Sequence, residues 1–553
     1  MKRKFQLFTA LIFFSVAAKS QLYNNGATFT IQEGGYVMVT GDVKNISGTI
    51  TNDGKIEVQG NFINSGNYTS TGNEDSLIMT GTGVDTLTGG SSVINNLTIN
   101  KSSNSDTVRL GGTTTVNTKL DYLSGVLSTD PILNPSFTLT SPVAAVYTIA
   151  TGKDIVGSVK RTGWTNGTAG IFNQANMQIT TNGGIAPTTF TTTMIPLNEG
   201  ADPTQNEREV KRKFLFTQTG GSGFTADVRF PYAPPELNTN VEANLVPWVL
   251  ISSEWNASVA TVTRATVDPD HYVMLTGISA SDLALEWKLA DPNYTFNVTA
   301  YIKGAWNNPI GLMRTTLNAG NLLPLTQPYT GAPYNYTGAE SVASIPNTNI
   351  VDWVLIEHRK PATGLPADAT AATITGRKAG FLLNNGNVVD LDGVTPITFN
   401  ISKQGGAFVV VRHRNHLAIM SNSIPSNTTG TFTNNYSVLA NSYKKPGATS
   451  DPTVILATAG AGSTLYGMWP GDVNSNGSVT TSDITPVNIA IAGPLSGNTN
   501  VYNVRDTNLD RNVTSADVSI TNSSIAAFAS TSSSIKTNRT EQVLASQVPG
   551  EVK

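Results

Sequence analysis

The sequence contains no cysteine, and this absence excludes three features. No disulfide bond can form, no metal site can be built on thiolates, and no lipobox cysteine is available for lipid attachment at a mature N-terminus. The fold therefore has to be held together by the packing of β-strands and by bound ions.

Charged side chains are scarce as well: they make up 13% of the 553 residues, against roughly 25% in an average soluble protein. The formal net charge of −3 and the pI near 5.9 give no electrostatic support for binding nucleic acid or an anionic membrane surface. The polar residues are mostly Thr, Ser, Asn and Gly, which favours β-strands joined by turns.

Long hydrophobic runs are absent after the first residues of the chain. A basic start at 2–4 precedes an apolar run at 5–18, and small residues at Ala18 and Ser20 predict a signal peptide over 1–20 with cleavage before Gln21. The apolar run is too short to span a bilayer. We expect a secreted protein, extracellular or on the outer cell surface, with no membrane insertion of the mature chain.

Motifs of familiar enzymes are missing too. There is no G-x-S-x-G, H-E-x-x-H, phosphate-binding loop or nucleotide fingerprint. Asp352 and Glu357 lie five apart on an expected strand and so on opposite faces, which disfavours a site of paired carboxylates. We expect no catalytic residues and no enzymatic activity.

An internal repeat stands out in the N-terminal part of the chain. Residues 36–45 align with 55–64 at an offset of 19, and related short strands follow at 78–81, 96–100 and 120–125. Strands repeated at this period and separated by Asn-Gly and Ser-Gly turns predict a β-solenoid over 21–130. The alternative is an ordinary β-sandwich with a coincidental repeat.

The rest of the chain predicts further β domains. Alternating strands and regular turn signals favour a β-sandwich-like domain over 131–290 and an Ig-like β-sandwich module over 291–440. A linker or strand at 441–468 and a flexible tail at 531–553 complete the division. Four aromatic residues in the loops between 303 and 350 either line a sugar site or fill the open end of a sandwich, and we favour filling. They are Trp306, Tyr329, Tyr334 and Tyr336.

Two twelve-residue stretches near the C-terminus repeat a single pattern 34 residues apart, with oxygen-bearing side chains at positions 1, 3, 5, 9 and 12. This spacing wraps a loop around Ca²⁺, so we predict two calcium sites and a helix after each loop. The predicted ligands are Asp472, Asn474, Asn476, Ser478, Thr480 and Asp483 in the first loop, and Asp506, Asn508, Asp510, Asn512, Thr514 and Asp517 in the second. Position 6 needs a positive φ; Gly477 suits it, whereas Arg511 predicts backbone strain and a positive charge near the second ion.

The segment from 412 to 416, Arg-His-Arg-Asn-His, offers two histidines, but their H-x-x-H spacing at a strand end does not predict a metal site. We expect a hydrogen-bonded corner instead, with its arginines paired to Asp390 or Asp392.

Three segments, 350–359, 387–394 and 409–420, resemble a module of secreted multi-domain surface proteins of Bacteroidetes. That module commonly stands before a dockerin-like segment, and 469–530 resembles one, with Asp rather than Glu at position 12 of each loop. In dockerins of cellulosomes, loop positions 10 and 11 bind cohesin. Here these positions are Thr481, Ser482, Ser515 and Ala516, although we favour a structural cap.

The resemblance implies a secreted, multi-domain architecture. From the chain as a whole we expect a non-catalytic extracellular protein built from serial β modules: an adhesin, or a subunit of a surface layer or filament. The implied partners are further copies of the chain, other surface proteins and glycans. The alternative is a carbohydrate-binding or scaffold-docking accessory protein of a polysaccharide-degrading system.

Three short segments resemble the D-S/T-aliphatic motif for O-glycosylation of exported Bacteroidetes proteins. They are 75–77, 85–87 and 106–108, and they make Ser76, Thr86 and Thr107 the predicted glycosylation sites.

Overall fold

The structure is a computed structural model that describes residues 20–535, apart from 71, 73, 130–136, 197–208, 259, 423–429, 458–463, 494–497 and 532–534. The predicted signal peptide up to residue 19 and the predicted tail beyond 535 lie outside the described residues. The chain divides into two compact units. The first comprises 1–196, 212–233 and 263–286, and the second comprises 197–211, 234–262 and 287–553.

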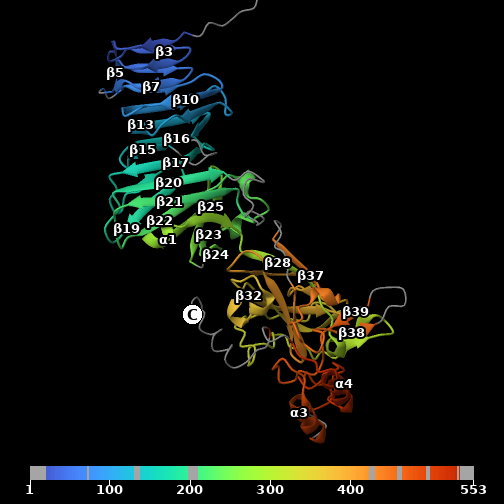
Figure 1. Ribbon diagram of the computed structural model, residues 1–553. Coiled ribbons are helices and arrows are strands. Elements are labelled where there is room, and N and C mark those ends of the chain that lie inside the picture. Colours follow the sequence, from blue (N-terminus) through green and yellow to red (C-terminus); the bar gives the residue numbers. More distant parts are fainter. Residues whose placement is uncertain are drawn as a thin grey trace, which may run out of the picture. The chain divides into compact units, whose positions relative to one another are not determined.

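The first unit begins with a parallel β-solenoid of about six turns (Figure 1). Its first three coils each contribute three strands: β1 (Leu22–Asn24), β2 (Thr28–Ile31) and β3 (Tyr36–Val39); β4 (Val43–Asn45), β5 (Thr49–Asn52) and β6 (Lys55–Val58); β7 (Phe62–Asn64), β8 (Asn67–Thr69) and β9 (Ser76–Met79). Tyr36 pairs with Lys55, which is the predicted offset of 19. The solenoid prediction is confirmed, and the alternative of a coincidental repeat is wrong.

Parallel pairing continues past residue 130. The later strands are β10 (Val84–Thr88), β11 (Val93–Asn100), β12 (Thr107–Leu110), β13 (Thr114–Ser124), β14 (Val126–Ser128), β15 (Thr138–Pro142), β16 (Val146–Ile149) and β17 (Ile155–Thr162). β17 pairs in parallel with β14 and β15, and in antiparallel fashion with β20 (Thr189–Pro196). The chain's own antiparallel strands therefore cover this edge of the last coil.

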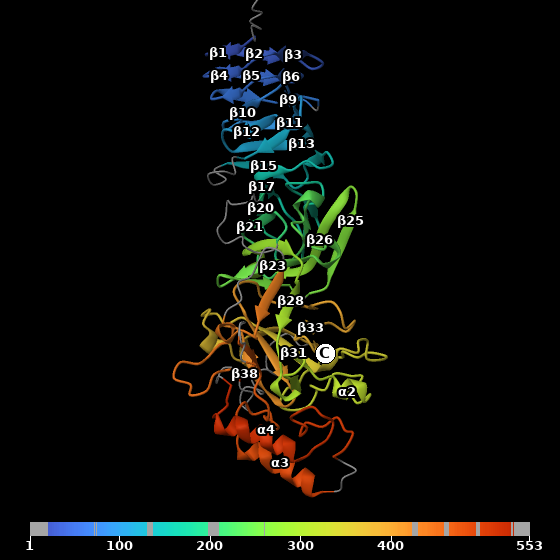
Figure 2. The same cartoon turned by 90° about the vertical axis from the view of Figure 1, so that its right-hand side faces the viewer.

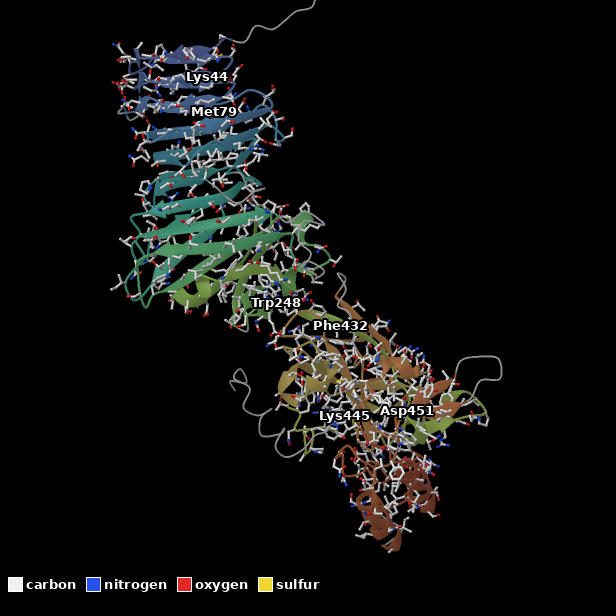
Figure 3. The ribbon with its side chains drawn as sticks, in the orientation of Figure 1. Lys44, Met79, Trp248, Phe432, Lys445 and Asp451 are labelled. Atoms are coloured by element: carbon white, nitrogen blue, oxygen red, sulfur yellow. The ribbon has the colours of Figure 1, made fainter. Side chains whose placement is uncertain are left out.

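Stacked side chains fill the solenoid. One column places Val39, Val58, Met79 and Ile99 in register, and all four are at most 5% exposed (Met79 is labelled in Figure 3). A second, polar column lies at the corner after the first strand of each coil. There the Asn24 amide donates to Asn45 Oδ1 over 3.0 Å, and the Asn45 amide donates to Asn64 Oδ1 over 2.7 Å. Such a buried ladder satisfies the amides only while the coils stay in register.

Antiparallel strands complete the first unit. They are β21 (Arg212–Thr219), which pairs with β20, and the sheet of β18 (Ala169–Ile171), β19 (Gln178–Asn182), β22 (Thr225–Pro231), β26 (Asp270–Ser279) and β25 (Val262–Val267). Aromatic rings fill this part, including Phe214 and Phe230, whose centroids lie 5.4 Å apart.

The second unit contains two sheets that share a core. The larger is antiparallel and runs β33 (Val388–Val389), β32 (Ile374–Leu383), β31 (Ile350–Arg359), β35 (Phe408–His413) and β36 (His416–Met420); the smaller runs β34 (Ile397–Asn400), β28 (Asn293–Thr299) and β37 (Thr431–Asn435). Phe296 and Phe399 stack at 4.1 Å, and Phe432 of β37 lies in the same core (Figure 3). This core extends from the sheets into the loops before β31.

Helix is rare in this mainly β chain, as the composition predicts. Two twelve-residue helices, α3 (Thr481–Ala492) and α4 (Ser515–Ala526), follow the Asx-rich loops, as predicted (Figure 2). Val487 of α3 is fully buried, whereas Phe528 lies beyond the end of α4 and is 72% exposed. No helix in the described ranges is long and apolar enough to cross a membrane.

Candidate metal centre

The first Asx-rich loop folds around Asp472. Its carboxylate accepts hydrogen bonds from the backbone N–H groups of Asn476 and Gly477, each over 3.0 Å. The side-chain oxygen of Asn474 also accepts from Asn476 N–H, over 3.0 Å. Gly477 has a φ of 78°, the left-handed conformation expected at position 6.

The second loop repeats this geometry. The Asp506 carboxylate accepts from the N–H groups of Asp510 and Arg511, over 3.1 and 2.8 Å. Arg511 has a φ of 72°, so a residue with a side chain occupies the left-handed position that glycine fills in the first loop. The sequence predicts this strain, and it costs about 1–2 kcal/mol.

Each loop closes on the first turn of its helix. Thr480 and Thr514 are the N-caps of α3 and α4, and each forms a capping box with the aspartate three residues later. Asp483 accepts from Asn474 N–H over 3.2 Å, and Asp517 accepts from Asn508 N–H over 3.1 Å. The carboxylate at position 12 thus reaches back to position 3 in both loops.

The carboxylates are buried in pairs. Asp472 and Asp506 are 4% and 0% exposed, and Asp483 and Asp517 are fully buried. Burial, with repulsion from Asp483, raises the pKa of Asp472 to about 7.

The second pair behaves in the same way. Burial, with repulsion from Asp517, raises the pKa of Asp506 to about 7, although Arg414 opposes the shift. Burial also raises the pKa values of Asp483 and Asp517. A cation between such carboxylates would relieve both the burial cost and the repulsion.

The donor set is mostly neutral. Within the described ranges, no group of three or more His, Asp or Glu side chains is placed to hold a metal ion. Any ion here would depend on amide, hydroxyl and backbone oxygens beside the two buried carboxylates of each loop, and such oxygens are ligands that Ca²⁺ accepts.

The loops and helices form one small module. Val473 and Val513, one from each loop, pack with Val487 of α3 in a common core. Val479 N–H donates to Ala529 O after α4 over 3.0 Å, and Val513 N–H donates to Asn498 O after α3 over 2.7 Å. Each loop is thus tied to the segment that follows the other helix.

The module is anchored to the β35–β36 turn of the same unit. The Asn415 side-chain amide donates to the backbone oxygens of Val504 and Asp506, over 3.0 and 2.7 Å. Arg414 donates to the backbone oxygen of Asn503, and its guanidinium lies 4.3 Å from the centroid of the Tyr502 ring. The chain just before the second loop is therefore held by two adjacent residues of this turn.

A glycine allows the second loop to approach closely. A Cβ atom on Gly304 would lie 2.1 Å from the backbone oxygen of Thr507. Ten residues on, Arg314 donates to the backbone oxygen of Asn508 over 3.0 Å. The second loop thus rests on the segment 304–314 through its main chain.

Asp352 is bonded to several residues of the polar network beside the second loop. Its carboxylate accepts from Arg414 Nε over 2.9 Å and from the Tyr502 hydroxyl over 2.7 Å, and it lies 3.1 Å from His413 Nε2. Burial would raise the pKa of Asp352, but Arg414 and His413 outweigh it and hold the value at about 2. Asp352 is therefore a buried carboxylate that stays ionised.

The two histidines continue this hydrogen-bond network. Gly304 N–H donates to His416 Nε2 over 3.1 Å, so a neutral His416 carries its proton on Nδ1, which lies 3.1 Å from His413 Nδ1. Burial keeps the pKa of His416 well below its usual range and lowers that of His413. The predicted hydrogen-bonded corner is present.

The predicted partners of the arginines in this corner are wrong. Arg412 bonds Glu357 over 2.9 Å and Arg414 bonds Asp352, whereas Asp390 pairs with Lys378 over 2.7 Å. β35 lies directly beside β31, and this sheet order brings the arginines to the carboxylates of β31.

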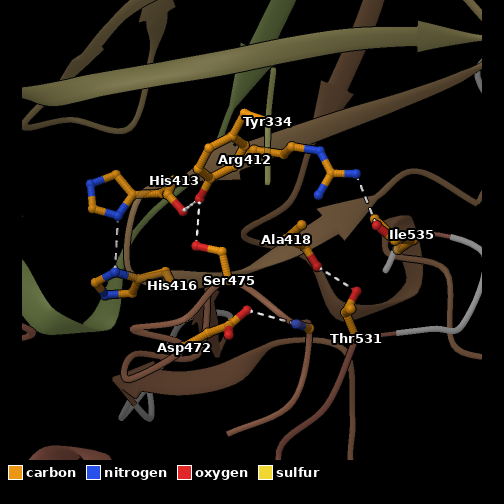
Figure 4. A pocket seen from close by; sticks show the side chains of 10 residues that line it. Tyr334, Arg412, His413, His416, Ala418, Asp472, Ser475, Thr531 and Ile535 are labelled. Carbon is orange, nitrogen blue, oxygen red and sulfur yellow. Dashed lines mark hydrogen bonds between the residues drawn. The ribbon is translucent and has the colours of Figure 1, made fainter. Parts of the chain in front are cut away.

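A cavity about the size of one water molecule lies between the corner and the first loop (Figure 4). The Tyr334 hydroxyl faces it, donating to His413 O over 3.1 Å and lying 2.9 Å from Ser475 Oγ. At this size the cavity is too small for an organic substrate.

The loop aromatics are core residues, as favoured. Tyr329 and Tyr336 are 0% and 6% exposed, and Trp306 and Tyr334 pack against the same core. These rings pack into the two-sheet core, with Trp306 and Tyr334 partly exposed.

The predicted glycosylation sites lie on solenoid strands. Ser76, Thr86 and Thr107 are partly exposed, while the aliphatic residue that follows each one points into the core. The preceding aspartates have structural partners. Asp75 binds two asparagine side chains, Asp85 pairs with buried Lys101, and Asp106 accepts from Gly83 N–H over 2.6 Å.

Sequence reasoning missed several anchoring residues. Nothing local marks Gly304, Arg314 or Tyr502, because the anchoring contacts Gly304–Thr507, Arg314–Asn508 and Tyr502–Asp352 each join residues 150 or more positions apart. Asn415 belongs to the segment that the sequence singles out, but its contact with the second loop has no signal in the sequence.

Comparison with protein-family models finds no match for this chain, and comparisons with curated proteins and with solved structures find none either.

Proposed function

We propose that this chain is a non-catalytic extracellular structural protein, an adhesin or a subunit of a surface layer or filament, exported after cleavage before Gln21. In this proposal calcium stabilises its C-terminal module. The observation that carries the proposal is the anchorage of the second loop. Asn415 and Arg314 donate to its backbone oxygens, and its main chain lies against Gly304. An ion in this loop would therefore make the attachment of the module to the β sheet more rigid.

The calcium ligands in this proposal are the twelve predicted residues. Both loops bury a pair of carboxylates and present further oxygens on one short arc of chain. An ion that binds only this folded arrangement stabilises it by mass action. The backbone favours the first loop as a calcium site, because Arg511 strains the second loop. The charge favours the second loop, which has one more carboxylate, Asp510.

The module is proposed to be dockerin-like, with one helix after each loop, and the two-sheet core to be an Ig-like sandwich. The residues at positions 10 and 11 are exposed: Thr481, Ser482, Ser515 and Ala516. Capping is nevertheless preferred to partner docking, because the module shares hydrogen bonds and buried side chains with the β sheet next to it.

A carbohydrate-binding role is the less favoured alternative. Of the aromatics proposed for it, Tyr329 and Tyr336 are buried and Trp306 and Tyr334 are partly buried against the same core, and the acidic residues of β31 are paired with buried arginines. Modification of Ser76, Thr86 and Thr107 by glycans remains part of the proposal, since their side chains are partly exposed.

Electron microscopy of the secreted protein, with calcium and with chelator, tests this function. We expect ordered assemblies in calcium that loosen in chelator, and particles of single monomers in calcium would contradict the proposal. Asp506→Asn should mimic chelation in the second loop, whereas the exposed Asp451→Asn should have no effect (Asp451 is labelled in Figure 3). Retention on insoluble polysaccharide, abolished by Trp306→Ala, would favour the accessory-protein alternative instead.

A further inference from the structure

The first coil of the solenoid has three strands that, among the residues the structure describes, are paired on one side alone. Within the described residues, β1, β2 and β3 pair only with β4, β5 and β6 of the second coil. The bonds to that coil use Leu22 N–H and the carbonyls of Asn24, Ala27, Ile31, Gly35 and Val39. Alternation along a strand therefore turns the N–H and C=O groups of the intervening residues away from the molecule. These residues are Tyr23, Thr28, Thr30, Tyr36 and Met38.

The interior of the solenoid is also open at this end. Leu22, Phe29 and Val37 point inward but remain partly exposed, whereas the residues stacked on them in the second coil are fully buried. On the outer faces, Tyr23, Tyr36 and Met38 are 59%, 53% and 50% exposed. The end thus presents apolar surface together with free backbone groups.

This edge lacks the usual protection against strand pairing. Soluble proteins shield open edges with lysine, proline, bulges or a covering segment. Residues 21–40 contain no lysine, arginine or proline and a single charged residue, Glu33, whereas residues 41–59 contain five charged residues. At the opposite edge of the solenoid, β17 is covered by β20.

We propose that this end docks onto the same end of a second copy of the chain, forming a two-fold dimer through continued β-sheet pairing. This inference rests on the proposed export, because removal of residues 1–20 leaves only Gln21 ahead of β1 and hence no preceding chain to cover the edge. Two nearly uncharged ends meet without repulsion. A head-to-tail arrangement is disfavoured because β20 already covers the other edge.

The two-fold axis fixes the register. A two-fold axis that passes through Phe29, perpendicular to the long axis of the solenoid, places β2 antiparallel to the β2 of the second copy. The same axis places β1 opposite the β3 of the second copy. Thr28 then lies opposite Thr30 of the partner subunit, and their free N–H and C=O groups bond in both directions. This pairing mode is strand addition at an open edge.

The test uses the full chain from Gln21, in calcium and in chelator, by analytical ultracentrifugation over a concentration series. We expect a dimer in both conditions, so a failed calcium proposal would not obscure this result. Thr28→Lys with Thr30→Lys places like charges opposite each other and should weaken the dimer at least about tenfold. The matched control is Thr49→Lys with Thr51→Lys, which occupies the same face one coil further in and should dimerise like the unmodified chain.

A second measurement tests the proposal even if the lysine variant misfolds. The chain has no cysteine, so Thr28→Cys with Thr30→Cys should form a disulfide-linked dimer on mild oxidation, since antiparallel paired residues lie within disulfide reach. Thr49→Cys with Thr51→Cys should not. Two results would overturn the proposal directly: a monomer at all concentrations, or equal effects of the two lysine pairs. Slow hydrogen exchange at the Thr28 and Thr30 amides of a monomer would also overturn it, because another segment would then cover the edge.

Discussion

When a chelator has removed calcium, the C-terminal module should become less stable as pH rises. When calcium is bound, the module should become more stable as pH rises. Without an ion, the carboxylates of Asp472 and Asp506 are buried against a second aspartate, and the pKa of each is raised from 3.8 to about 7. A raised carboxyl pKa means that the folded module binds a proton more tightly than the unfolded chain does. Its stabilising contribution is present below pH 4 and is lost as pH rises towards 7.

The magnitude follows from the size of the shift. At 1.36 kcal/mol per unit, a rise from 3.8 to about 7 corresponds to roughly 4 kcal/mol for each aspartate between pH 4 and pH 8. Calcium binds the ionised form, so its gain should be large at pH 8 and small at pH 5. Asp352 and Glu357, whose pKa values lie at about 2, stay ionised across this range and do not contribute.

Hydrogen exchange followed by mass spectrometry, on peptides spanning 472–493 and 506–527, isolates the module from the rest of the chain. In chelator we expect more protection at pH 5 than at pH 8 after correction for intrinsic exchange, and in calcium the opposite order. Asp472→Asn should flatten the pH dependence of the first peptide. Equal protection at both pH values in chelator, or no gain from calcium at pH 8, would refute the reasoning.

Three further predictions follow from single positions. Gly304→Ala should lower protection of the second loop by at least about 2 kcal/mol, because the added Cβ would lie 2.1 Å from a loop carbonyl oxygen, whereas Gly331→Ala, with open space around it, should not. Asn45→Ala should destabilise the solenoid by about 2–4 kcal/mol in urea unfolding, because Asn24 and Asn64 each lose a hydrogen-bond partner. The control is Asn67→Ala, at an exposed position, and an equal effect there would contradict a stabilising role of the ladder. Arg511→Gly should raise the calcium affinity of the second loop about fivefold to thirtyfold in calorimetry, because it relieves strain worth about 1–2 kcal/mol and removes a positive charge. Unchanged affinity would count against both effects.

Features with a short period along the chain could be predicted from the sequence. The 19-residue offset fixed the solenoid register because parallel coils stack like residues on like. The helices α3 and α4 followed from the loops, since the aspartate at position 12 is also the third residue of a capping box. The Asn45–Asn64 rung lay within the aligned repeat, yet nothing local marked it as a ladder.

Contacts between distant segments could not be predicted. The arginines of the β35–β36 corner were assigned to acidic residues close in sequence, but the neighbouring strand is β31, so Glu357 and Asp352 are their partners. Sheet order decides such pairs, and a single sequence carries little information on it. The same limit hid Gly304, whose small size matters only because a loop some 200 residues later rests on it.

The most direct test of the central claim is calcium stoichiometry by equilibrium dialysis on the full secreted chain at pH 7.5. We predict two ions per chain, reduced to one by Asp472→Asn or by Asp506→Asn and to none by both together. Absence of bound calcium in the unmodified chain, or two ions still bound in the double variant, would contradict the account.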